Sequence, residues 1–140
     1  MHFAFSIFLE KKFMSFTLLD LGSENFEFRA NIWNWKPTLE IIKNFDIVDE
    51  GKLRQMSYNA TGAQFSDEEA QTIGEKIRDE ILPKLEPNKR MFGDLSVTDA
   101  PDDGTFHSEG KEEWKNYSVS YDWLKDFSEF CLKSEGFQVF

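Results

Sequence analysis

The stretch NIWNWKPTLEIIKNF, residues 31–45, contains the change of structure on which the fold of this chain depends. Residues 26–32, which lead into this stretch and overlap its first two positions, alternate between apolar and polar. This alternation is the period of a half-buried β-strand. Pro37 suits the first turn of a helix, where its missing N–H is not needed, and the apolar residues after it follow helical spacing. The stretch therefore predicts a strand followed by a helix that begins near Pro37 and ends near residues 46–48.

Two tryptophans lie at this change of structure. Trp33 and Trp35 are two residues apart, so in a strand both face the side opposite to Phe28 and Ile32, unless the strand has ended or bulged. A tryptophan on an outer face needs a cover, which is a helix of the same domain, a partner or a ligand. We expect Trp35, next to Pro37, to be structural and Trp33 to be partly exposed.

The residues upstream predict a β-hairpin. Phe16, Leu18 and Asp20 occupy alternate positions, and the sequence Gly-Ser-Glu-Asn at residues 22–25 supplies the turn before the strand at 26–32.

Downstream, the chain carries its clearest helix. Ser66 and the glutamate three residues later form a capping box, and an isoleucine stripe that includes Ile73 and Ile77 follows at helical spacing. We expect a helix over about residues 67–82, with Ile73 and Ile77 in the core. Pro83 removes a helical hydrogen bond, so a kink or an end is expected there.

The remaining segments before the last helix are less regular. Residues 53–58 alternate weakly, so a short strand is one possibility there. Residues 87–111 are polar and rich in glycine and proline, which predicts a long surface excursion with one short strand around residues 95–97.

The C-terminal part predicts a helix and a final strand. The helix begins near Ser118 or Ser120, ends before Gly136, and is followed by the apolar sequence FQVF at residues 137–140. Taken together, the elements predict an α+β fold in one domain, residues 1–140. In it, a small antiparallel sheet, made of the N-terminal hairpin and short strands, packs with about three helices.

The first 13 residues are expected to be an extension outside the core. Their apolar run, residues 3–9, has no basic residue before it and is too short to cross a membrane. The alternative is a first strand, because Phe3, Phe5 and Ile7 share one parity. If residues 1–13 are an extension, their deletion leaves the fold intact.

Composition excludes several classes of protein. The chain has 26 Asp and Glu against 16 Lys and Arg, a formal net charge of −10, and 16% aromatic residues. The aromatic content is too high for a disordered acidic tail, and the charge disfavours nucleic acid, because the basic residues do not cluster. A basic protein is a permitted partner. The single cysteine, Cys131, lies on an apolar helical face and is expected to be a small buried hydrophobe.

A search for catalytic and metal-binding motifs predicts no catalytic residue, no metal ligand and no cofactor. The chain has no glycine loop for phosphate, no nucleophile elbow and no paired-histidine zinc helix. Residues 99–110 resemble a calcium loop only in part, because Pro101 and Gly110 occupy ligand positions. His107 beside Asp102, Asp103 or Glu109 is an alternative general base, but no nucleophile is near it in sequence.

Three segments resemble a known family. The segments are FEFRANIWNWKP, then MSYNATG before the acid-capped helix, and finally FSEFCLKSEGFQVF. They resemble a set of small uncharacterised bacterial proteins in which an N-x-W-x-W-[KR]-P-like segment precedes an N-x-x-G-like loop. The resemblance covers most of residues 15–140 and implies a bacterial, cytoplasmic single domain with no established activity.

The sequence supports two hypotheses about function. A hydrolase that uses carboxylates or a metal ion for catalysis ranks below both. The first is a non-enzymatic, acidic protein-interaction module of the immunity or inhibitor kind, with a basic protein as its partner and no nucleic acid or membrane. The alternative is a small-ligand-binding domain whose pocket is lined by Trp, Asn and Arg. The sequence leaves the oligomeric state open. The candidate partner or ligand site consists of Trp33, Trp35, Asn31, Arg54, Tyr58 and Asn59.

Overall fold

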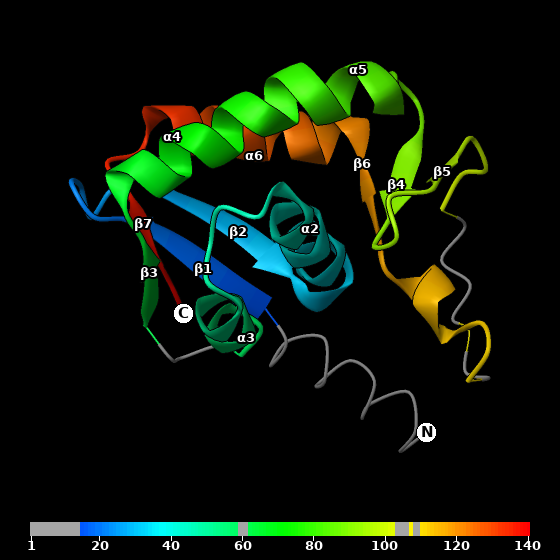
Figure 1. The fold of residues 1–140 in the computed structure, drawn as a ribbon, viewed down its shortest axis with the longest axis horizontal. Coiled ribbons are helices and arrows are strands. Elements are labelled where there is room, and N and C mark those ends of the chain that lie inside the picture. The colour runs from blue at the N-terminus through cyan, green and yellow to red at the C-terminus, as the bar shows by residue number, and fades with distance from the viewer. Residues whose placement is uncertain (1–14, 59–61, 103–106, 108–109) are drawn as a thin grey trace.

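The computed structural model of this chain describes residues 15–58, 62–102, 107 and 110–140. These residues form two small antiparallel sheets and four helices, so the predicted α+β class is confirmed (Figure 1). The predicted extension at residues 1–13 lies outside the described residues.

The two sheets differ in size and position. The larger has the strand order β2-β1-β7-β3, so the last strand of the chain pairs with the first, and the smaller has the order β5-β4-β6. The strands are β1 (Ser15–Asp20), β2 (Glu27–Asn31), β3 (Ala63–Phe65), β4 (Arg90–Phe92), β5 (Val97–Thr98), β6 (Ser118–Ser120) and β7 (Phe137–Val139).

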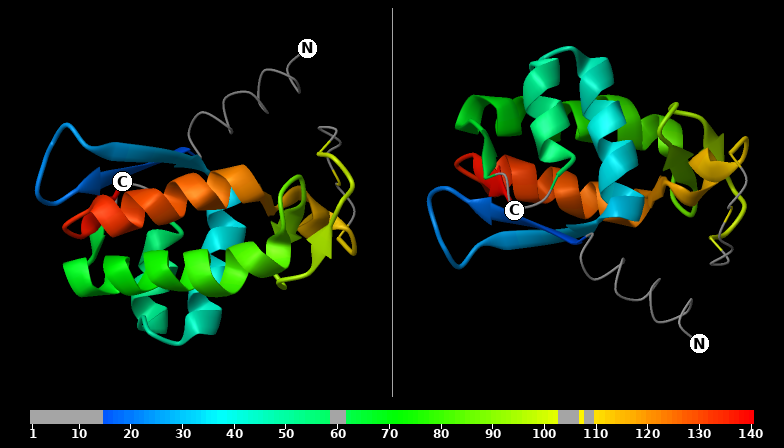
Figure 2. Two further views of the ribbon diagram at one scale, coloured as in Figure 1. Left: turned by 90° about the horizontal axis from the view of Figure 1, so that it is seen from above. Right: turned by 90° about the horizontal axis from the view of Figure 1, so that it is seen from below.

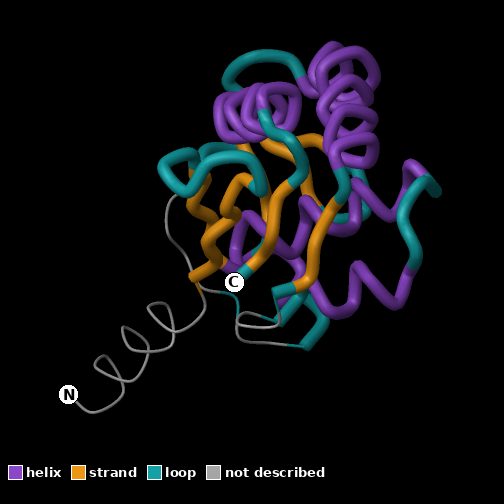
Figure 3. The backbone as a smooth tube through the Cα atoms, turned by 90° about the vertical axis from the view of Figure 1, so that its left-hand side faces the viewer, coloured by secondary structure: helices purple, strands orange, loops and turns teal. Residues whose placement is uncertain are grey.

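The helices form two pairs. The long helical segment from α4 to α5 lies beside α6, and α2 lies beside α3, as the two views of Figure 2 show. Figure 3 looks nearly along the first pair, with the strands below it. The helical segments are α2 (Ile32–Phe45), α3 (Glu50–Met56), α4 (Asp67–Lys76), the π-helical turn η1 (Ile77–Ile81), α5 (Leu82–Leu85), the 3-10 turn η2 (Glu113–Asn116) and α6 (Tyr121–Lys133).

The N-terminal hairpin is confirmed. β1 pairs with β2 in antiparallel register, and Phe16, Leu18 and Asp20 on the inner face are buried. The carboxylate of Asp20 accepts hydrogen bonds from the backbone N–H of Glu135 at 2.7 Å and from that of Gly22 at 3.1 Å. This carboxylate therefore ties the hairpin turn to the turn between α6 and β7.

Helix α2 begins earlier than predicted. It starts at Ile32, because Asn31 and Asn34 form a capping box: each side chain accepts a hydrogen bond from the other residue's backbone N–H, at 3.1 and 3.0 Å. Pro37 therefore lies inside the helix, and the prediction of a start near Pro37 is wrong. Both tryptophans are helical, which removes the strand-parity argument about them. The predicted end is confirmed, with Asp46 as the C-cap.

The short strand considered for residues 53–58 is a helix instead. Helix α3 starts after Asp49, whose side chain accepts a hydrogen bond from the Lys52 backbone N–H at 3.1 Å. Leu53 and Met56, three residues apart, are its buried residues. Local alternation in the sequence is thus overridden by a cap and by burial of one helical face.

The helix predicted over residues 67–82 is confirmed, and it continues past Pro83. The capping box at Ser66 is present, and Ile73 and Ile77 are fully buried. The π-helical turn precedes Pro83: the backbone N–H of Leu82 bonds the carbonyl of Ile77, five residues back. This wider turn accommodates the missing N–H of the proline, so the helix does not stop there.

The polar excursion contains more structure than one strand. β4 pairs with both β5 and β6, and Leu95 has a φ of 71°, so it belongs to the turn and the strand begins at Val97. The last helix follows the Ser120 cap, and the final strand β7 is present, as predicted.

The core is centred on an aromatic residue of α6. The ring of Phe127 lies within 6.2 Å of four other rings, and it is itself fully buried. Cys131, one helical turn further along, is also fully buried, and that burial raises the pKa of its thiol well above the ordinary value. The prediction of a buried cysteine is confirmed. The rings around Phe127 are those of Phe28, Trp35, Trp123 and Phe137.

Candidate functional site

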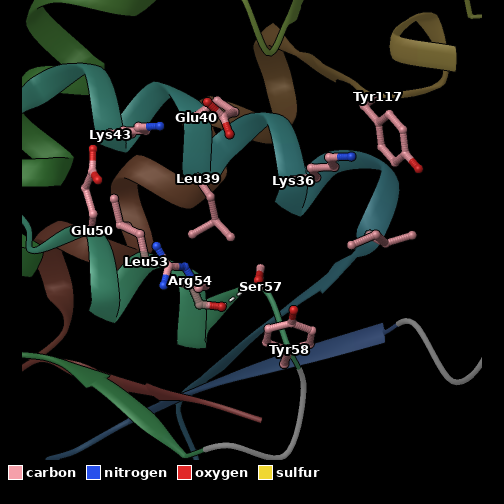
Figure 4. Close-up of a pocket in the computed structure, with 11 residues that line it drawn as sticks. Lys36, Leu39, Glu40, Lys43, Glu50, Leu53, Arg54, Ser57, Tyr58 and Tyr117 are labelled. Carbon is pink, nitrogen blue, oxygen red and sulfur yellow. Dashed lines mark hydrogen bonds between the residues drawn. The ribbon is translucent and has the colours of Figure 1, made fainter.

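A groove of about 500 Å³ lies between the outward sides of α2 and α3 (Figure 4). We call it the α2–α3 groove. It has an apolar floor and a rim of charged and tyrosine side chains. Its lining residues are Ile32, Lys36, Leu39, Glu40, Lys43, Glu50, Leu53, Arg54, Ser57, Tyr58 and Tyr117.

One wall of the groove is a single face of α2. Lys36, Leu39, Glu40 and Lys43 follow one another at spacings of three, one and three residues, so helical geometry places them on the same side. Leu39 is buried, whereas the three charged side chains are exposed. The early start of α2 fixes this register, since Asn31 caps the helix that carries all four.

The opposite wall is α3 and the residues after it. Leu53 is buried and Arg54 is exposed, as expected for neighbouring positions on the inner and outer sides of a helix. The hydroxyl of Ser57 donates to the Arg54 carbonyl at 2.5 Å and so completes the last turn. Tyr58 follows with 64% of its surface exposed.

Tyr117 closes one end of the groove from a distant part of the chain. Its ring lies 5.3 Å from that of Trp33, and the Lys36 ammonium lies 4.3 Å from its centroid, within cation–π range. Burial, followed by the negative charge of Glu113, raises the pKa of Tyr117 above its ordinary value. Like any tyrosine hydroxyl, that of Tyr117 is protonated at neutral pH and can donate a hydrogen bond.

A second groove of about 480 Å³ adjoins the first on the far side of Lys36 and Tyr117. Both residues, together with Glu40, line the two grooves, so the two are neighbours along the outward face of α2. Trp114 lies in the second groove, 48% exposed, with its ring edge-on to Phe92 at 4.9 Å.

The structure brings two of the predicted site residues together. Arg54 and Tyr58 both line the α2–α3 groove. Asn31 instead caps α2, and Trp35 is fully buried, where its indole N–H donates to the Met56 carbonyl at 2.8 Å. The expectation that Trp35 is structural is confirmed.

The remaining two predicted site residues, Trp33 and Asn59, do not line the groove in the part of the chain that the structure describes. Trp33 is partly buried beneath the ring of Tyr117, so it supports one end of the groove and is not among its lining residues. Asn59 lies outside the described residues.

Most lining residues of these grooves were not predicted from the sequence, among them two lysines and two aromatic residues. Lys36 and Lys43 are seven residues apart, a helical spacing that becomes informative once the helix is known to start at Ile32. Tyr117 and Trp114 carry no local signal, because they reach this face only through the pairing of β6 with β4.

The groove is locally basic in an acidic chain. Its lining holds three basic side chains and two acidic ones, whereas the whole chain has a net charge of −10. Within the described part of the chain, no carboxylate lies within ion-pair distance of Lys36, Lys43 or Arg54.

The alternative general base, His107, lies near a carboxylate further along the chain. The Nδ1 atom of His107 lies 3.9 Å from the Glu112 carboxylate, and Asn116 makes two hydrogen bonds with the His107 backbone. Asp103 and Glu109 lie outside the described residues. In the described ranges, no three His, Cys, Asp or Glu side chains gather closely enough to hold a metal ion.

Comparisons with known proteins give no relative. No family model, curated protein or solved structure matches this chain. The resemblance to small bacterial proteins with an N-x-W-x-W-[KR]-P-like segment stays a prediction. Among the helices that the structure describes, none has both the length and the apolar character needed to cross a membrane.

Proposed function

We propose that this chain is a non-enzymatic protein-interaction module of the immunity or inhibitor kind, acting in the bacterial cytoplasm. The observation that carries the proposal is the set of aromatic side chains that line the two adjoining grooves: Tyr58, Tyr117 and Trp114, with Arg54 also in the lining. Tyrosine, tryptophan and arginine are the residues most enriched among the energetic centres of protein interfaces. We call this surface, over α2, α3 and η2, the aromatic face.

The net charge supports a basic partner. A charge of −10 produces a long-range field that speeds the approach of a positively charged protein and repels acidic ones. Because a field of this kind acts mainly on the association rate, partner binding should slow as ionic strength rises.

The experiment is capture of the partner from lysate of the source organism, its identification by mass spectrometry, and titration of the purified pair. Tyr58→Ala and Trp114→Ala should each weaken binding at least tenfold, because each removes an exposed aromatic contact on this face. Both variants should keep the wild-type melting temperature.

Leu21→Ala is the matched control. Leu21 is also an exposed apolar side chain, 44% exposed, but it does not line either groove. Its alanine variant should bind like wild type. Wild-type affinity in both aromatic variants would contradict the proposal.

A small-ligand-binding domain is the second candidate. The observation that favours it is the volume of the α2–α3 groove, about 500 Å³, which falls within the range of small-molecule sites. Arg54 would meet an anionic group and Tyr58 an apolar or aromatic one. A thermal-shift screen of small metabolites against wild type and Arg54→Ala tests it: a hit that disappears in the variant would support this reading.

A further inference from the structure

We infer that the α2–α3 groove binds an acidic peptide segment of the partner protein. The inference rests on the proposed function, since it names what the interaction module holds at one part of its aromatic face. The charged side chains in the groove act on the segment that docks there. The net charge of the chain acts at longer range, on the approach of the whole partner.

The first step is the supply of available cations. Lys36, Lys43 and Arg54 line the groove, are exposed, and make no ion pair with any residue in the described ranges. Six other lysines and arginines in the described ranges are paired with a carboxylate, for example Lys52 with Glu69 at 2.7 Å, whereas some, such as Lys84 and Lys125, are not. An incoming carboxylate therefore finds three positive groups in the groove that need not first break an ion pair.

The groove also contains two acids, which set the pattern of charge. Glu40 lies between the two lysines along α2, and Glu50 projects from the α3 side near Lys43 (Figure 4). The lining therefore carries three positive and two negative side chains. This alternation favours a ligand whose carboxylates are separated by neutral residues over one with continuous negative charge.

The spacing of the cations favours an extended ligand. Lys36 and Lys43 are seven residues apart on α2, which corresponds to about 10 Å along a helix axis. A peptide in the extended polyproline II conformation rises about 3.1 Å per residue with three residues per turn, so side chains three residues apart lie on one face and span roughly this distance. A compact anion such as free phosphate would contact only one end of the groove.

The floor and the ends suit a polypeptide. Leu39 and Leu53 are buried beneath the groove and offer apolar surface to aliphatic parts of a peptide, while Tyr58 and Tyr117 flank it. At 0.15 M salt the Debye length is about 8 Å, so the nearby cations influence a docked carboxylate more than distant acids do. An acidic segment can thus bind here although the chain as a whole is acidic.

The test uses fluorescence polarisation with a labelled 12-residue peptide that carries glutamate at every third position in an alanine background. Its matched analogue has glutamine at those positions. A single-stranded oligonucleotide of equal charge and inorganic phosphate serve as competitors. We expect the glutamate peptide to bind saturably, the glutamine peptide to bind at least tenfold more weakly, and neither competitor to displace the peptide at equal concentration.

Variants of the full chain locate the site. The double variant Lys43→Glu/Arg54→Glu should weaken glutamate-peptide binding at least tenfold, whereas Lys43→Arg, which keeps the positive charge, should bind nearly as well as wild type. Lys125→Glu, a reversal at an exposed position of α6, is the matched control and should stay within twofold of wild type. Circular dichroism on each variant checks that the fold is unchanged, as expected for exposed positions.

The inference is overturned if the two peptides bind equally, if the double reversal binds like wild type, or if the oligonucleotide or phosphate displaces the peptide. Its failure can be told from failure of the proposed function. If Trp114→Ala and Tyr58→Ala no longer bind the partner protein but Lys43→Glu/Arg54→Glu still binds it, the proposed function is supported and the inference of an acidic segment is contradicted. If Trp114→Ala and Tyr58→Ala bind the partner protein like wild type, the proposed function is contradicted. Peptide binding that still depends on Lys43 and Arg54 would then support only a peptide site in the groove.

Discussion

The two helix pairs of this protein pack in opposite ways. Where α4 meets α6, the hydroxyl of Ser128 donates to the Gly74 carbonyl at 2.8 Å, and a Cβ on Gly74 would come within 2.8 Å of the Leu132 side chain. The pair α2 and α3 is joined at its base by the hydrogen bond from Trp35 to Met56, but its outward sides leave a groove of about 500 Å³.

The difference shows which residues folding constrains. At the α4–α6 contact a small residue allows two backbones to approach, and nearly any change there alters packing. In the α2–α3 groove the rim residues are long, charged and exposed, so the fold places few demands on them. Residues without a packing role are free to be selected for binding, which is why we place the function in the groove.

The largest effect is expected in the tight pair. Ile77 is fully buried at the end of α4, and Ile77→Asp would place an unpaired charge in the core. The cost should be on the order of 5 kcal/mol, comparable with the whole stability of a domain. We expect loss of cooperative thermal unfolding by circular dichroism. A soluble variant with a cooperative transition would contradict the packing described for this pair.

The next effect concerns the base of the groove. Trp35→Ala should cost about 4 kcal/mol, because it leaves a cavity and strands the buried Met56 carbonyl. Trp33→Ala should cost about half as much, since Trp33 is only partly buried. Urea unfolding of both variants measures the difference. Equal costs would show that Trp33, too, belongs to the core.

A smaller, pH-dependent effect comes from the contact between α3 and α4. Burial acts to raise the pKa of Glu69, but hydrogen bonds from Lys52 and from the Ser66 backbone, with the charge of Lys52, outweigh it and lower the pKa below 4.5. A carboxylate with a lowered folded-state pKa stabilises the fold fully above its unfolded pKa. That stabilisation is lost as the pH falls through the folded-state pKa.

Lys52→Met should therefore cost about 1 kcal/mol at pH 7, a value that allows for partial solvent screening of the pair. The gap between wild type and variant should narrow as the pH falls below 4.5 and through the lowered folded-state pKa of Glu69, where the carboxylate takes up a proton. Urea titrations at pH 3, 5 and 7 measure the gap. A gap that is constant over this range would show that the lysine acts through packing alone.

The smallest effects are expected at the rim of the groove. Lys43→Ala, Arg54→Ala and Tyr58→Ala should each change the free energy of unfolding by less than about 0.5 kcal/mol, because these side chains are exposed. The same urea titration at pH 7 serves for all three. A loss of 2 kcal/mol or more at any of them would mean that the groove residue has a structural role, and the contrast between the two helix pairs would fail there.

Much of the scaffold could be predicted from sequence, whereas the site could be predicted only in part. The hairpin, the Ser66-capped helix and the buried Ile73 and Ile77 depend on residues no more than a few positions apart. The start of α2 was missed although its signal is local, because an Asn31–Asn34 capping box competes with Pro37 as a helix-start signal.

The sequence by itself determined the α+β class, the acidic charge and the periodic elements, because strand alternation and helix capping act between near neighbours in the chain. Only the tertiary structure decided that Arg54 and Tyr58 face Lys36 and Lys43 across a groove, and that Tyr117 closes it. The ring of Tyr117 reaches Trp33 through a sheet pairing and a helix contact over many residues of intervening chain. Contacts of that kind depend on packing of whole elements, which no local pattern encodes.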